Sequence, residues 1–137
     1  MTYHPGMFRT LTVLTATALI LGSTSAVADA QPDQSPCNYN LTAPTVVNVS
    51  GTNIVTATIS PGSCDGANIF QTVACLQMQG SDGPGQCAKG QGILPAQVFF
   101  QPYHPGATYI STGRGCASKG NPAQKYCQET GPITATL

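Results

Sequence analysis

The chain has 137 residues, and its five Lys or Arg side chains balance five Asp or Glu side chains, so the formal net charge is zero. A groove for nucleic acid needs clustered cations, and adhesion to anionic lipid needs them too. The sequence therefore predicts neither partner, because the cations beyond residue 30 are dispersed: Lys89, Arg114, Lys119 and Lys125.

The first thirty residues have the order of a secretory signal peptide. A polar lead ending at Arg9 precedes an apolar run over 11–21, and small residues with two A-x-A sites follow over 26–30. A membrane anchor is the weaker interpretation, because this run has about eleven residues and a spanning helix needs about twenty. A buried helix of the mature fold is disfavoured by the A-x-A sites. We predict a signal peptide over 1–30, starting at Met1 or Met7 and cleaved before Asp29 or Gln31, with no membrane span after cleavage.

Beyond the signal peptide we expect a flexible tail over 31–36 and one β domain over 37–137. Helix formers rarely run together there, whereas short stretches alternate apolar and polar residues between Gly, Pro and Asn clusters. In chain order these are two arms around Ser50-Gly51 within 47–59, then 69–79, 96–101, 107–112 and 133–137. Several short strands of this kind predict an all-β antiparallel sandwich.

All six cysteines lie beyond the signal peptide. An even number of cysteines in an exported chain predicts three disulfides. Metal ligation is the rejected alternative, because structural zinc sites place ligands about two to four residues apart. The closest cysteines here, Cys116 and Cys127, are eleven apart.

The turn signals favour one pairing among the fifteen that six cysteines allow. Facing residues in an antiparallel hairpin are equidistant from the turn, so a bridge between them is centred on that turn. Three sequential pairs meet this condition: Cys37–Cys64 around Ser50-Gly51, Cys75–Cys87 within 80–85, and Cys116–Cys127 at Asn121-Pro122. The competing scheme, with one bridge across the sandwich, stays open.

Catalytic patterns are weak in this sequence. His104, the one histidine beyond the signal peptide, precedes Pro105-Gly106, which indicates a surface turn. No nucleophile motif is present, the acids are scattered, and we expect neither enzymatic activity nor a cofactor nor a metal. Arg114, between Gly113 and Gly115, is a candidate for holding a carboxylate or phosphate, with an exposed loop residue as the plainer interpretation.

Two resemblances refine these expectations. The run Pro105-Gly106-Ala107-Thr108-Tyr109 resembles the tyrosine-bearing entry to the F strand of an immunoglobulin-like domain, although Cys116 follows Tyr109 by seven residues instead of two. The stretch 73–87 and the cysteines Cys116 and Cys127 resemble the enediyne-antibiotic apoproteins, a group of small secreted actinobacterial proteins. The Cys37/Cys64 pair departs from that family.

The apoprotein resemblance implies an immunoglobulin-like sandwich with short-range disulfides and carries over no ligand-pocket residue. The alanine- and threonine-rich signal and the cysteine pattern are also similar to those of uncharacterised secreted mycobacterial proteins. That similarity implies export and no particular activity.

These observations lead to one function hypothesis and three alternatives. The first is a secreted, monomeric, non-enzymatic binding module, extracellular or at the cell envelope, for an unidentified protein or small molecule. Aromatic and basic residues near loops are its candidate binding residues: Phe99, Tyr103, Tyr109 and Arg114. The alternatives are a small-molecule carrier of the apoprotein type, an enzyme inhibitor presenting the loop over 80–90, and a hydrolase using His104.

Overall fold

The computed structural model describes residues 35–137, so the predicted signal peptide over 1–30 and most of the predicted tail lie outside the described residues. The described part consists of strands and connecting turns, with no helix. Its strands are β1 Cys37–Leu41, β2 Thr45–Val49, β3 Thr52–Cys64, β4 Asn68–Met78, β5 Gln86–Gln91, β6 Ala96–Phe100, β7 Thr108–Lys119 and β8 Gln124–Thr136.

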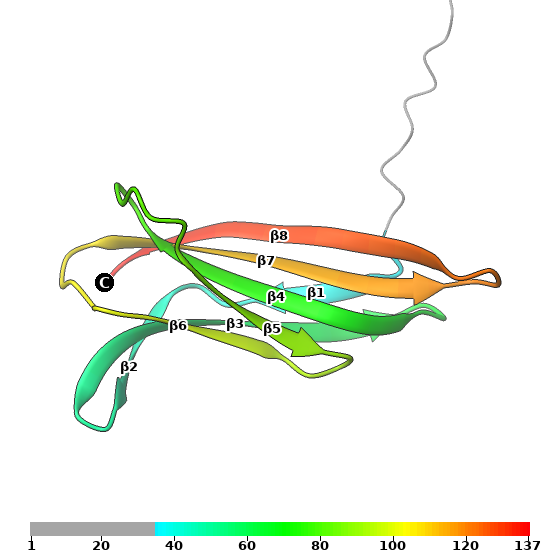
Figure 1. Ribbon diagram of the computed structural model, residues 1–137, viewed down its shortest axis with the longest axis horizontal. Coiled ribbons are helices and arrows are strands. Elements are labelled where there is room, and N and C mark those ends of the chain that lie inside the picture. The colour runs from blue at the N-terminus through cyan, green and yellow to red at the C-terminus, as the bar shows by residue number, and fades with distance from the viewer. Residues whose placement is uncertain (1–34) are drawn as a thin grey trace, which may run out of the picture. The chain divides into compact units, whose positions relative to one another are not determined.

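The strands form two antiparallel sheets packed as a sandwich (Figure 1). In one sheet the long strand β3 pairs with β1 and β2 along one edge and with β6 along the other. The second sheet has the order β5-β4-β7-β8. With β1 and β2 taken as one strand interrupted over 42–44, this is the order of an immunoglobulin-like sandwich. The predicted fold class is confirmed.

The β2–β3 turn is built by three polar or small residues. Ser50 and Gly51 both have positive φ, 52° and 86°, as a two-residue type I′ hairpin turn requires. The Oδ1 atom of Asn48 accepts the N–H of Gly51 at 3.1 Å, and its Nδ2 donates to Oδ1 of Asn53 at 3.0 Å. The turn thereby sets the register of β2 on β3, with Val49 facing Thr52.

Each disulfide joins two directly facing residues of an antiparallel pair. Cys37–Cys64 links β1 to β3, Cys75–Cys87 links β4 to β5, and Cys116–Cys127 links β7 to β8. Their Cα–Cα distances are 4.0, 4.1 and 4.1 Å, and no cysteine is free. The turn-centred pairing is confirmed, and the alternative scheme with one bridge across the sandwich is wrong.

The core between the sheets is formed by inward-facing side chains of both layers. Its largest fully buried members include Tyr109, Ile59, Leu76, Val55 and Val98. Two glycines of β7 make room for them. A Cβ at Gly115 would overlap the ring of Tyr39, and a Cβ at Gly113 would lie 2.8 Å from Cδ1 of Ile59. The inner face of β7 is therefore shaped to receive side chains from the opposite sheet.

The predicted strands are correct in type but incomplete. The stretch over 107–112 is the start of the longer strand β7, and the stretch over 133–137 overlaps the end of β8. Strands β1 and β5 were not predicted by alternation. Glycine in a strand usually indicates a bulge or a break. The chain stays in strand conformation through Gly113 and Gly115, although the pairing of β7 with β8 shifts register between Ser111 and Gly113. Aromatic and aliphatic groups from the facing sheet fill the space that these glycines leave.

Candidate functional site

Tyr109 belongs to the core of the domain and not to its surface. Its side chain is fully buried, and its ring lies edge-to-face on Phe100 with a centroid distance of 5.7 Å. The phenol oxygen accepts the backbone N–H of His104, five residues upstream, at 2.8 Å. This is the tyrosine corner of immunoglobulin-like domains. Tyr109, predicted as a candidate binding residue, is therefore not available on the surface of the domain.

The other aromatic candidates lie on different surfaces. Phe99 is 45% exposed and lies opposite Thr56 on the outward side of β6. Tyr103 is half-buried and packs against the core cluster. The structure therefore does not bring Phe99, Tyr103 and Tyr109 together around a pocket.

Arg114 faces outward from β7, while the glycines on either side of it face the core. Its Nε lies 3.5 Å from Oε1 of Glu129 on β8, and both side chains are more than half exposed. An exposed pair of this kind contributes about 0–1 kcal/mol. The two glycines of the Gly113-Arg114-Gly115 motif thus allow side chains of the facing sheet to pack closely against β7. The arginine between them already has a carboxylate partner.

His104 is exposed in the β6–β7 connection, and its backbone N–H, not its ring, bonds to Tyr109. Among residues 35–137, no three His, Cys, Asp or Glu side chains are grouped so that they could hold a metal ion. In the same residues, no helix has the length and apolar character needed to cross a bilayer.

The β5–β6 turn carries the most exposed large apolar side chains of the described residues. Ile93 is 77% exposed and Leu94 is 63% exposed. Sequence reasoning missed both residues. The available signal was an apolar pair between Gly92 and Pro95, two residues that usually border a polar turn.

The backbone of this turn is pinned on both sides. The N–H of Leu94 donates to the carbonyl of Gln91 at 3.2 Å, and the N–H of Gly92 donates to the carbonyl of Phe70 at 3.0 Å. The hydroxyl of Thr72, which is buried in β4, donates to the carbonyl of Leu94 at 3.2 Å. Ile93 and Leu94 are therefore held out into solvent by a fixed backbone.

Beside the turn lies a hollow of about 500 Å³ that is lined mainly by apolar residues. Its volume falls in the range of about 300–1,000 Å³ that is common for ligand sites. It separates the end of β3 from the start of β4, and Ile93 forms part of its wall: Pro61, Gly62, Cys64, Ala67, Asn68, Ile69 and Ile93. We call this the apolar hollow.

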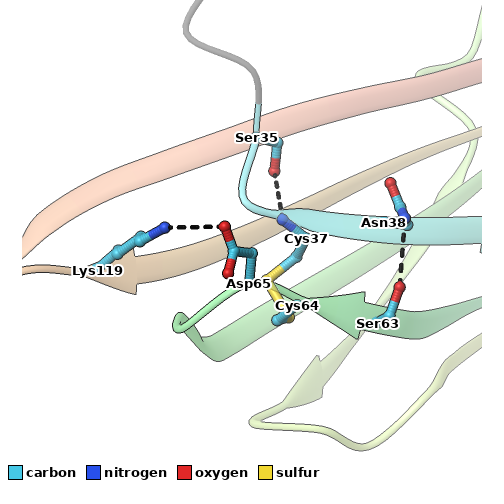
Figure 2. The surroundings of a disulfide bond; sticks show 7 residues. All are labelled: Ser35, Cys37, Asn38, Ser63, Cys64, Asp65 and Lys119. Atoms are coloured by element: carbon cyan, nitrogen blue, oxygen red, sulfur yellow. Dashed lines mark hydrogen bonds and ion pairs between the residues drawn. A yellow bond between two sulfur atoms is a disulfide. The ribbon is translucent and has the colours of Figure 1, made fainter.

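A second hollow, of about 620 Å³, lies on the other side of the end of β3 and is mainly polar. We call it the polar recess. Its lining comes from three separate parts of the chain: Ser35, Pro36, Asn38, Ser63, Cys64, Asp65, Lys119 and Tyr126. Figure 2 shows the Cys37–Cys64 disulfide between two cross-links, the ion pair of Lys119 with Asp65 and the hydrogen bond of Asn38 with Ser63.

A third hollow lies at the base of the β4–β5 loop and measures about 210 Å³. It is smaller than common ligand sites. Neither Phe99 nor Tyr109, the residues expected to line a carrier pocket, is among its walls: Cys75, Leu76, Gln77, Pro84, Cys87, Ile110 and Thr112. The loop predicted over 80–90 is shorter in the structure, because β5 already begins at Gln86.

Comparison with known proteins finds no significant match to this chain among protein-family models, curated proteins or solved structures.

Proposed function

We propose that this protein is an exported, non-enzymatic binding module that docks a protein partner through the β5–β6 turn and the apolar hollow. The observation that carries the proposal is the exposure of Ile93 and Leu94 on a pinned turn. Burying a side chain of this size contributes about 1.5–3 kcal/mol. A fixed backbone lowers the ordering cost of binding, so more of this energy is available as affinity.

The shape of this region favours a protein over a small ligand. Two side chains project from the turn, and the hollow recedes beside them. A protein partner can match both features at once. Its surface would offer an apolar cavity to Ile93 or Leu94 and would place an apolar side chain in the hollow. Hot spots of protein interfaces commonly pair a projecting apolar group with a pocket in this way.

Two considerations support export. The three disulfides and the absence of free cysteine fit an oxidising compartment. The predicted signal peptide supplies a route to it. N-terminal sequencing of material from the culture medium or cell envelope tests this part: we expect a first residue of Asp29 or Gln31, and an exported chain that still begins at Met1 or Met7 would contradict it.

The docking proposal is tested by identifying the partner and then measuring its affinity for variants. The oxidised protein, carrying a photo-crosslinking residue at Ile93, would be used to label proteins of the same compartment. With the labelled partner purified, the double variant Ile93→Ser/Leu94→Ser should bind at least about tenfold more weakly, which corresponds to about 1.4 kcal/mol.

The matched control is Val49→Ser at the end of β2, next to the β2–β3 turn. Val49 is also an exposed apolar residue, at 47%, and its turn lies at the other end of the sandwich (Figure 1). This variant should bind as the parent protein does. Equal binding by the Ile93→Ser/Leu94→Ser protein would contradict the docking site, as would equal losses in both variants.

A second candidate, an enzyme inhibitor, is favoured by the β4–β5 loop. This loop stands away from the sheets in Figure 1 and is closed at its base by Cys75–Cys87. Ser81 N–H donates to the Met78 carbonyl at 3.2 Å, and its hydroxyl accepts the Gly83 N–H at 3.3 Å. Inhibition assays against secreted proteases and glycosidases, with loss of inhibition on replacing residues 81–83, would support this candidate over docking through the turn.

A further inference from the structure

We propose that the polar recess is a binding site for a neutral carbohydrate, distinct from the surface that docks the protein partner. The two sites are neighbours, because Cys64 lies in the walls of both the recess and the apolar hollow. Ile93 and Leu94 do not line the recess.

The recess is assembled before any ligand arrives. The Cys37–Cys64 disulfide joins the strand that carries Asn38 to the strand that carries Ser63. The backbone N–H of Asp65 donates to the carbonyl of Pro36 at 2.8 Å, which fixes the β3–β4 turn against the start of β1. A site held in this way needs little ordering when it binds, and weak contacts can then give measurable affinity.

The charge of the recess favours a neutral ligand. Its two charged side chains, Lys119 and Asp65, have opposite sign, and Nζ lies 3.5 Å from Oδ2. A phosphate or carboxylate placed on Lys119 would meet the carboxylate of Asp65, and a cation placed on Asp65 would meet the ammonium group. A ligand without net charge avoids both repulsions.

The polar groups of the recess match hydroxyl groups. Lys119 only donates hydrogen bonds and the ionised Asp65 only accepts them, whereas Asn38 and Ser63 do both. A hydroxyl also donates and accepts, so adjacent hydroxyls on one ligand can satisfy all of these groups together. Both ion-pair side chains keep free hydrogen-bonding capacity, because their side chains are 40% and 96% exposed.

Tyr126 adds an aromatic wall to these polar groups. It is half-buried, and its hydroxyl donates to Oε1 of Gln124 at 3.3 Å. An aromatic ring offers a flat apolar face with a partial negative charge. The ring C–H groups of a sugar present the complementary surface. A polar recess of about 620 Å³, whose two charged side chains cancel and which has one aromatic wall, is therefore suited to a sugar ring.

The test is an NMR titration of the oxidised, isotope-labelled protein with D-glucose, D-galactose and D-mannose, and separately with sodium phosphate. We expect at least one sugar to cause saturable shifts confined to the amides around Asn38, Ser63, Asp65, Lys119 and Tyr126. Phosphate should not cause them. Absence of local shifts with all three sugars would overturn the proposal, and stronger shifts with phosphate would replace it with an anion site at Lys119.

Substitutions then separate a sugar contact from a structural role. Tyr126→Leu should weaken binding of the responding sugar about tenfold, the loss typical of an aromatic contact, while Tyr126→Phe should retain binding. Lys125→Ala is the matched control. Lys125 precedes Tyr126 in β8, but its Nζ lies 5.9 Å from the ring centroid of Phe70, and it does not line the recess.

Unchanged sugar binding by a folded Tyr126→Leu protein would refute the aromatic wall. Ile93→Ser/Leu94→Ser should bind the sugar normally, so failure of the docking proposal and failure of the carbohydrate proposal can be told apart.

Discussion

Replacing Gly115 by alanine tests how the two sheets are joined. The added Cβ would overlap Cδ1, Cε1 and Cζ of the Tyr39 ring, which is almost fully buried. Overpacking of a core usually costs about 1–3 kcal/mol. The gain from replacing a strand glycine by alanine is smaller, about 0.4–1 kcal/mol. We therefore expect Gly115→Ala to lower the free energy of unfolding by about 1–3 kcal/mol.

Two other glycines provide the comparison. At Gly113 the new Cβ would lie 2.8 Å from Cδ1 of Ile59 and from Cγ2 of Thr130, which are methyl groups that can shift by rotation. Gly113→Ala should therefore cost less than Gly115→Ala. At Gly83 the nearest atom is Oγ of Ser81 at 3.6 Å, so Gly83→Ala should leave stability nearly unchanged.

The assay is reversible thermal unfolding of the oxidised proteins, in which about 1 kcal/mol shifts the Tm of a domain of roughly 100 residues by about 4–8 °C. In a Tyr39→Ala background the penalty of Gly115→Ala should disappear, because the ring that causes the overlap is gone. A Gly115→Ala protein as stable as the parent would refute the reasoning. An equal penalty in the Tyr39→Ala background would refute it as well.

Three further predictions concern the Cys75–Cys87 disulfide, Tyr39 and His104. Cys75→Ala with Cys87→Ala should lower the free energy of unfolding by about 2–5 kcal/mol in denaturant titrations, and an unchanged midpoint would contradict this. Burial raises the pKa of Tyr39, whose buried hydroxyl has no hydrogen-bond partner among residues 35–137. The share of stability that comes from this group is therefore present below pH ~10 and is lost as the pH rises through the folded pKa. Tyr39→Phe should remove that alkaline loss and should equal or exceed the parent in stability at neutral pH; a Tyr39→Phe protein with the parent's alkaline melting profile would contradict this. His104→Ala should change stability by less than about 0.5 kcal/mol, because Tyr109 bonds to the backbone of residue 104; a folded variant that had lost a measurable activity would make His104 a catalytic candidate.

The disulfide pairing could be predicted because each bridge belongs to one hairpin. The turn at Ser50-Gly51 has the backbone conformation that its residues favour, and the chain on either side then faces itself at fixed distances. The pairing of Cys37 with Cys64 holds even though the chain leaves the hairpin over 42–44. A bulge between Cys37 and Tyr39 shifts the register of β1 by one residue and brings the two cysteines opposite each other.

The binding candidates could not be predicted in the same way. Phe99 and Tyr109 are both aromatic residues near turns, yet one is 45% exposed and the other is fully buried. This difference in exposure depends on which side chains, remote in sequence or in the facing sheet, cover each ring. Ile93 and Leu94 are exposed because the chain passes there from β5 in one sheet to β6 in the other, a connection that no local pattern encodes.

Local features of the sequence by themselves determined the all-β class, the turn-centred strand pairing and the three disulfides, because backbone conformation and hairpin register depend on residues near each other in the chain. Tertiary structure alone decided which side chains reach the surface and which segments meet there. The polar recess shows this: its walls come from the start of β1, the end of β3 and the two strands β7 and β8. Packing of the two sheets brings those segments together, and it depends on long-range contacts such as the close fit of Tyr39 against Gly115.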